Sequence, residues 1–142
     1  MRDAFPRTKI EDVSLSRMII GTNWFLGFSP TSKSKDDFIK QHMTRERIAE
    51  VLERFFREGV DALLGIRPEA QHLIDAVKDA EDRTGVACTR TGTPHIDVSG
   101  TPAAADANRR TFAAYAEIGV KVCMPHQCST DAMLHRPSHS LP

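Results

Sequence analysis

The sequence predicts an α/β protein built from parallel βαβ units. Three times a segment with helical periodicity ends in Gly-Val and continues into a short apolar run, at Gly59, Gly85 and Gly119. Glycine accepts the left-handed conformation just past a helix end, and valine favours the start of a strand. Strands that alternate with helices form parallel sheets, so we expect the (βα)4 half of a TIM-type (β/α)8 barrel or, alternatively, a small open parallel sheet.

The segments that precede these glycines have the apolar spacing of amphipathic helices. Thr44 is a candidate N-cap for the first, Pro68 marks the first turn of the second, and Thr101 with Pro102 begins a third that is rich in alanine. Apolar residues three and four positions apart then form one buried stripe on each helix. The stripes are Ile48, Val51, Leu52, Phe55 and Phe56, then Ala70, Leu73, Ile74 and Val77, then Phe112, Tyr115 and Ile118.

Four short segments are the expected strands, and they are mostly apolar instead of alternating, as is typical of parallel strands covered on both faces. Residues 1–16 are expected to form an N-terminal extension, residues 17–134 the (βα)4 half-barrel, and residues 135–142 an irregular tail. The strand segments are RMIIGTN (17–23), VDALLGI (60–66), VACTRT (86–91) and VKVCMP (120–125).

Four strands would make an incomplete barrel. A (β/α)8 barrel has eight strands and typically ~250 residues, whereas this chain has 142 residues. The first and last strands of a half-barrel have unpaired edges, so we expect a homodimer formed through these exposed sheet edges as one outcome. The competing hypothesis is a non-catalytic truncated fragment, or a half-barrel that functions only as an oligomer.

Composition and charge argue against several classes of partner. Nineteen basic and nineteen acidic residues give a formal net charge of zero, which provides no general attraction to nucleic acid or to an anionic membrane. The sequence has no apolar run of membrane-spanning length and no signal-peptide core at its N-terminus, so we expect a cytoplasmic protein. Its three cysteines are odd in number and lack C-x-x-C spacing, which disfavours a disulfide framework.

Polar side chains follow each expected strand. The carboxyl ends of parallel strands meet at the same edge of a sheet or barrel, and ligands bind there. We therefore expect one site, formed by residues that come directly after the four strands. The candidates are Asn23, Thr31, Lys33, Arg67, His95, Asp97, His126 and Asp131.

The types of these residues suggest a small phosphorylated or carboxylated metabolite as substrate. Lys33, Thr31 and Arg67 supply positive charge and a hydroxyl suited to an anion, and Asn23 is a candidate for positioning the substrate. A solvated surface loop is the simpler explanation of the segment SPTSKSK (29–35), and anion binding is the alternative. No P-loop or G-x-S-x-G motif is present, so the pattern indicates neither a nucleotide site of that type nor a serine hydrolase.

Two histidines are the candidate catalytic or metal-binding groups. His126 suits a general acid or base, with Asp131 or Asp97 as its carboxylate partner. His95 and His126 would be the ligands of a divalent metal if one is used. Metal binding, metal-free acid/base catalysis and structural hydrogen bonding all stay open at this point, as do lyase, isomerase and hydrolase chemistry.

Three segments carry a resemblance to a family of uncharacterised prokaryotic (β/α)8-barrel proteins: GTNWFLG, TSK-x-KD and PHQ-x-x-TD. The resemblance extends from about Arg17 to about Leu134 and covers the N-terminal half of such a barrel. It implies Asn23, Lys33, His126 and Asp131 as site residues and names no reaction. Two positions depart from the pattern, since Pro30 replaces a polar residue and Cys128 replaces a hydroxyl-bearing one.

Overall fold

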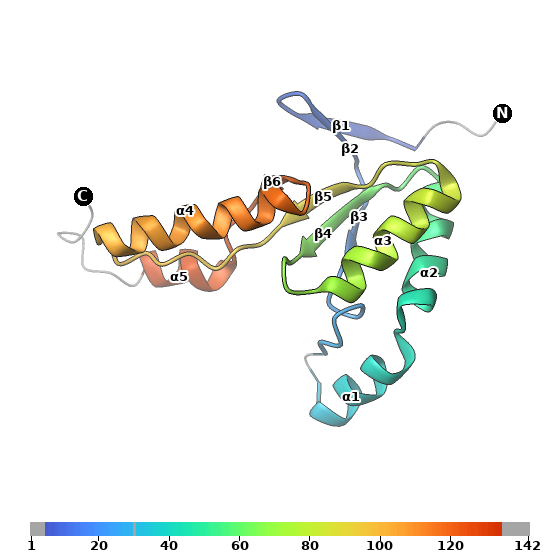
Figure 1. Cartoon of the computed structure of the whole chain (residues 1–142), viewed down its shortest axis with the longest axis horizontal. Coiled ribbons are helices and arrows are strands. Elements are labelled where there is room, and N and C mark those ends of the chain that lie inside the picture. The colour runs from blue at the N-terminus through green and yellow to red at the C-terminus, as the bar shows by residue number, and fades with distance from the viewer. Residues whose placement is uncertain (1–4, 30, 135–142) are drawn as a thin grey trace.

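The computed structural model describes residues 5–29 and 31–134, and it confirms the predicted α/β class with parallel βαβ units (Figure 1). The expected tail at 135–142 lies outside the described residues. The strands are β1 (Arg7–Ile10), β2 (Val13–Ser16), β3 (Ile19–Gly21), β4 (Ala62–Ile66), β5 (Thr89–Gly92) and β6 (Val120–Cys123). The helices are α1 (Lys33–His42), α2 (Arg45–Arg57), α3 (Gln71–Thr84), α4 (Pro102–Glu117) and α5 (Gln127–Leu134).

The four predicted strands form one parallel sheet in the order β3-β4-β5-β6. Ile20 aligns with Leu63, Leu63 with Arg90, and Arg90 with Val120, so neighbours in the sequence are neighbours in the sheet. All four strands therefore end at the same edge. This arrangement is consistent both with half of a barrel and with an open parallel sheet.

Local signals at two of the three predicted helix starts act as expected, whereas Pro68 lies in a turn ahead of α3, which begins at Gln71. The hydroxyl groups of Thr44 and Thr101 accept hydrogen bonds from the backbone N–H groups of Arg47 and Ala104, which caps α2 and α4. Gly85 ends α3 with φ +70°. Gly59 and Gly119 lie in the other two helix-to-strand turns with φ +81° and +76°, a conformation that a side chain would strain.

Three elements were not predicted: the hairpin β1–β2, helix α1 and helix α5. The hairpin pairs antiparallel within the segment expected to be an N-terminal extension. Helix α1 buries only Ile39, and α5 buries only Ser129, so neither has the apolar stripe that identifies a helix in a sequence. None of the described helices is long and apolar enough to cross a membrane.

The core lies between the sheet and helices α2 and α3, which pack side by side over one face (Figure 1). Ile20, Leu63 and Ile66 provide the apolar surface of the strands. The opposing helix residues are fully or almost fully buried. They are Ile48, Leu52 and Phe56 from α2, and Leu73, Ala76 and Val77 from α3.

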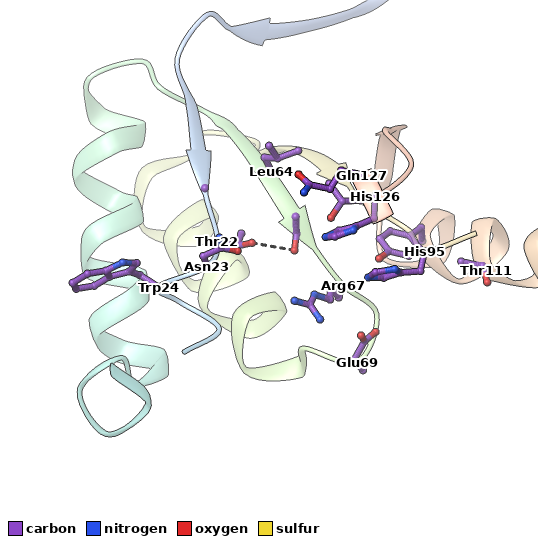
Figure 2. Close-up of a pocket in the computed structure, with 14 residues that line it drawn as sticks. Thr22, Asn23, Trp24, Leu64, Arg67, Glu69, His95, Thr111, His126 and Gln127 are labelled. Atoms are coloured by element: carbon purple, nitrogen blue, oxygen red, sulfur yellow. Dashed lines mark hydrogen bonds between the residues drawn. The ribbon is translucent and has the colours of Figure 1, made fainter. Parts of the chain in front are cut away.

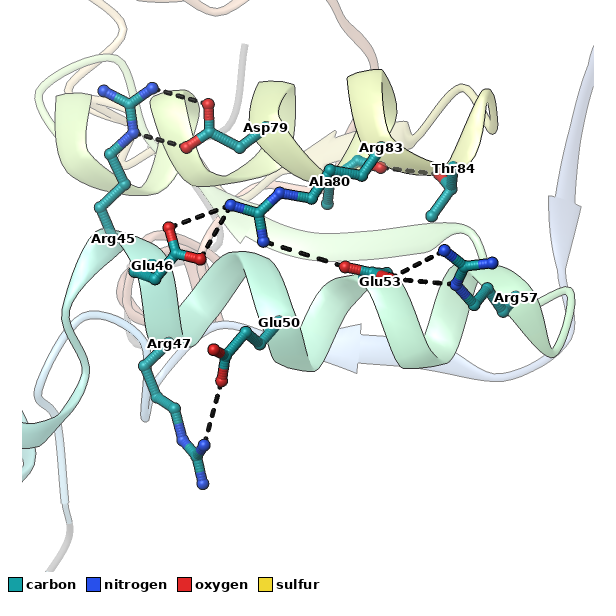
Figure 3. Close-up of polar contacts among 10 residues, drawn as sticks. All are labelled: Arg45, Glu46, Arg47, Glu50, Glu53, Arg57, Asp79, Ala80, Arg83 and Thr84. Carbon is teal, nitrogen blue, oxygen red and sulfur yellow. Dashed lines mark hydrogen bonds and ion pairs between the residues drawn. The ribbon is translucent and has the colours of Figure 1, made fainter.

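A network of ion pairs joins the outer surfaces of α2 and α3 (Figure 3). Arg45 donates two hydrogen bonds to the carboxylate of Asp79, at 2.6 and 2.7 Å. These bonds lower the pKa of Asp79 and raise that of Arg45. Arg83 reaches from α3 to Glu46 at 2.9 Å and to Glu53 at 3.8 Å. Exposed ion pairs contribute little to stability, so the cohesion of the two helices comes mainly from the core beneath them.

The hairpin is fastened to the amino-terminal ends of β4 and β5. The buried Ser16 hydroxyl accepts hydrogen bonds from the N–H groups of Asp61 and Ala62, at 3.2 and 3.1 Å, and donates to the Met18 carbonyl at 2.6 Å. The Asp61 carboxylate in turn accepts the Ser16 N–H at 3.2 Å and pairs with Arg7 at 2.7 Å. The end of the sheet opposite the expected site is therefore closed by hydrogen bonds.

Replacing Ser16 by alanine is expected to lower the free energy of unfolding by about 2–3 kcal/mol, because two buried N–H groups lose their acceptor. Urea denaturation followed by circular dichroism measures this change. Ser14→Ala is the matched control, since among the described residues the Ser14 hydroxyl accepts a single, exposed bond from Arg7, and it should cost less than about 0.5 kcal/mol. Equal losses in the two variants would contradict the role assigned to Ser16.

Candidate functional site

A pocket of about 690 Å³ lies at the carboxyl ends of the parallel strands (Figure 2). Its walls come from the segments after β3, β4, β5 and β6, together with one face of α4. Thr22 forms part of the floor, where its hydroxyl donates to the Gly65 carbonyl at 3.0 Å. The polar and aromatic lining residues are Thr22, Asn23, Trp24, Arg67, Glu69, Thr93, His95, Thr111, Tyr115, His126 and Gln127.

The structure brings four of the eight predicted site residues together in this pocket. Asn23, Arg67, His95 and His126 all line it, each contributed by the exit of a different strand. Thr31, Lys33, Asp97 and Asp131 do not line it. The two groups differ in how far along the sequence they lie from a strand end. The four lining residues come within about three positions of the end of their strands.

Lys33 lies in the first turn of α1, whose N-cap is Ser32. Thr31 is exposed just before this helix and shares a hydrogen bond of 2.6 Å with Ser29. The ammonium group of neighbouring Lys35 lies 5.5 Å from the centre of the Trp24 ring, which connects α1 to the rim of the pocket. The lysine-rich segment therefore forms a helix start beside the site and not a loop over it.

The two aspartates predicted as partners of histidine lie outside the pocket. Asp131 is exposed on α5. The backbone N–H of Asp97 donates to Asn108 at 2.9 Å, and its carboxylate accepts the Ser99 N–H at 2.8 Å. Asp97 thus takes part in the turn that leads into α4. The carboxylate that does line the pocket is Glu69.

His95 and His126 form a stacked pair on the β5–β6 side of the pocket (Figure 2). Their ring centres are 4.2 Å apart with an angle of 23° between the planes. The backbone N–H of His126 donates to the Pro94 carbonyl at 2.9 Å, which joins the segments that follow β5 and β6. Nδ1 of His126 accepts the Cys128 N–H at 3.2 Å. In the neutral ring the proton is therefore on Nε2, which makes that atom the donor.

Arg67 is the cationic group of the pocket. Its guanidinium carbon lies 4.9 Å from the centre of the Phe28 ring, a cation–π contact that supports the side chain. Within the described part of the chain, Arg67 makes no ion pair. The ion pairs found there join other arginines to carboxylates. A guanidinium without a carboxylate partner is suited to bind an anionic ligand.

Tyr115 is a pocket residue that the sequence assigned only to an apolar helix stripe. Burial raises the pKa of its hydroxyl, Glu69 raises it further, and Arg67 opposes the shift. The hydroxyl is therefore neutral at physiological pH and is available as a hydrogen-bond donor. The ring packs against Gly92, where an added Cβ atom would come within 2.4 Å of it. No sequence motif marks this pairing of a tyrosine with a glycine.

The pocket offers a metal ion fewer protein ligands than a dedicated metal centre usually has. Among residues 5–29 and 31–134, no cluster of three or more His, Cys, Asp or Glu side chains is arranged to hold a metal ion. His95 and His126 would contribute two imidazole nitrogens, and structural or catalytic zinc sites take three or four protein ligands. A divalent metal at this pair stays a prediction.

Fold and pocket together define an α/β protein with a polar site at the carboxyl edge of a parallel sheet. No family model, curated protein or solved structure matches the chain. The resemblance to an uncharacterised barrel family therefore stays a prediction, and the site is interpreted from its own geometry.

Gly92→Ala is expected to displace Tyr115 from the pocket wall and to lower the free energy of unfolding by about 1–3 kcal/mol, because the new methyl group overlaps the ring. Chemical denaturation and tyrosine fluorescence measure the two effects. Gly21→Ala is the matched control in the same pocket, since an added Cβ there meets no atom within 4 Å. A Gly92 variant as stable as this control would contradict the packing described.

Cys88 and Cys128 should differ strongly in reactivity. Burial raises the pKa of the Cys88 thiol to about 12, whereas Cys128 is exposed. At pH 8 only about one Cys88 in ten thousand is then the reactive thiolate. Treatment with iodoacetamide at pH 8 followed by peptide mass spectrometry should detect the label on Cys128 well before Cys88. Simultaneous labelling of both would contradict this assignment.

Proposed function

We propose that this chain is the (βα)4 half of a (β/α)8-barrel enzyme that acts on a small phosphorylated or carboxylated metabolite. The observation that carries the proposal is Arg67, an arginine held over Phe28 that opens into a 690 Å³ pocket without a carboxylate partner among the described residues. The pocket lies where barrel enzymes bind their substrates, at the carboxyl ends of the strands. Its size suits a metabolite and not a polymer.

Residues around Arg67 could orient a bound anion. The Thr22 hydroxyl already donates to the Gly65 carbonyl. The Asn23 amide and the Tyr115 hydroxyl also line the pocket, have no side-chain hydrogen bond to another described residue, and can turn toward a ligand. Both are neutral donors that line the same pocket as Arg67. An anionic group bound by Arg67 would thus leave the rest of a small substrate near the stacked histidines.

His126 is the proposed general acid or base. Its Nδ1 atom accepts a backbone N–H, which leaves Nε2 to exchange a proton with a substrate atom. His95 lies against the same ring at 4.2 Å, and the contact restricts rotation of His126. This arrangement supports proton transfer, a step that lyases, isomerases and hydrolases all use. Ligation of a divalent metal by both rings is an alternative use of the pair.

The competing hypothesis is a non-catalytic half-barrel that acts only within an oligomer. It is favoured by the exposed edge strand β3, where Ile19 is 41% accessible to solvent. The two hypotheses differ in the pocket, because a purely structural module has no need of an anion-binding arginine. Ligand binding at Arg67 therefore discriminates between them.

Replacing Arg67 by methionine is expected to weaken binding of inorganic phosphate at least tenfold, because a hydrogen-bonded charge contributes about 1.5–3 kcal/mol. Phosphate-dependent thermal shifts and isothermal titration measure the affinity. Arg47→Met is the matched control, since Arg47 is an exposed arginine on α2 that pairs with Glu50 and with no other residue the structure describes, and it should bind phosphate like the wild type.

Two results would overturn the proposed function. The first is a wild-type protein whose stability does not respond to phosphate, acetate or small phosphorylated and carboxylated metabolites. The second is an Arg67→Met variant that binds phosphate as tightly as the wild type and the Arg47→Met control do, because the anion would then bind elsewhere.

A further inference from the structure

Helices α2 and α3 cover only one face of the parallel sheet. Ile20 and Leu63 point into the core beneath these helices. Ile19 is the preceding residue of β3, so its side chain points to the opposite face, which we term the inner face. Ile19 is 41% exposed there, and Leu64 is half-buried. Ala62 and Thr91, which align with these residues, are buried, so the inner face is open mainly toward the β3 edge. Parallel sheets are normally covered on both faces, so this open part can receive a further layer.

Both edges of the sheet also lack a neighbour within the described residues, with β3 at one edge and β6 at the other. Large apolar side chains are exposed beside each edge. Met18, Ile19 and Trp24 lie in or next to β3, and Met124, Met133 and Leu134 follow β6. Exposed apolar side chains in or next to unpaired edge strands, such as Ile19 at β3 and Met124 at β6, mark an interaction surface.

We infer that a second copy of this chain covers the inner face and pairs with both edges, which forms a closed barrel of eight parallel strands. The inference rests on the half-barrel of the proposed function. Two copies supply the eight strands that a (β/α) barrel needs. A two-fold axis along the barrel keeps all strands parallel and places β6 of each copy beside β3 of the other. The formal net charge of zero imposes no long-range repulsion between copies.

The second copy would complete the pocket as well as the sheet. The segment after β6 carries His126, and the segment after β3 carries Asn23 and Trp24. Where β6 adjoins β3 of the other copy, the partner's Asn23 and the partner's Trp24 would lie beside the segment that carries His126. Each proton-transfer histidine would then face substrate-positioning groups from both chains.

Analytical ultracentrifugation of the ligand-free 142-residue chain tests the inference. The wild type should sediment with twice the mass of one chain. Ile19→Lys alters the β3 edge and Met124→Asp alters the β6 edge, and each variant alone should shift to the mass of one chain because both junctions of its pair are altered. Circular dichroism verifies that the variants are folded. Met18→Lys replaces Ile19→Lys if that variant does not fold.

Mixing the two variants provides the decisive measurement. A pair made of one Ile19→Lys chain and one Met124→Asp chain has one unaltered junction and opposite charges at the other. The mixture should therefore regain a species of twice the chain mass that neither variant forms alone. Ile10→Lys is the control, because Ile10 is 46% exposed on the hairpin and away from both edges. It should leave the wild-type mass unchanged.

A wild type with the mass of one chain at all concentrations, an open series of larger assemblies, or a mixture that fails to regain the paired species would each overturn the inference. None of these results bears on phosphate binding at Arg67, which is measured separately. A chain that binds phosphate as a monomer would retain the proposed site without the pairing. A pair that binds no anion would retain the pairing without the proposed function.

Discussion

The packing of helices α2 and α3 against one face of the sheet is the constraint on which the other features depend. Each helix returns the chain to the amino-terminal edge of the sheet, so β3, β4 and β5 run in the same direction. Ile20, Leu63 and Arg90 of these strands lie in register. The segments after these strands consequently emerge at one edge, where the pocket is formed. If α2 and α3 did not bury Leu52 and Leu73 against the sheet, the segments after the strands would not be held together at one edge.

Local sequence signals predicted much of the fold because the three helix-to-strand joints are determined locally. Gly59, Gly85 and Gly119 adopt positive φ values that other residues resist. Such signals fail where stability comes from distant residues. Strand β1 is exposed throughout, and the hairpin is held by Ser16 and Asp61, which are 45 positions apart. Helix α1 has a serine cap and a single buried residue, so its periodicity is weak.

The site was predictable to the extent that it follows strand ends. Asn23, Arg67, His95 and His126 meet in the pocket because topology alone brings strand exits together. Side chains farther along each loop depend on the path of the loop, and Asp97 is drawn into the turn before α4. Tyr115 was missed for a different reason. Helical periodicity shows which face is buried, but it does not show that the face meets Gly92 beside a cavity.

The hairpin at the closed end of the sheet has a consequence for the order of folding. Its contacts reach Asp61 and Thr89, which are 45 and 75 positions from their partners Ser16 and Ser14. Contacts of such sequence separation form late, because closing a long loop costs conformational entropy before the contact compensates for it. Strands β1 and β2 are thus expected to dock last, after β4 and β5 have provided the surface that receives them.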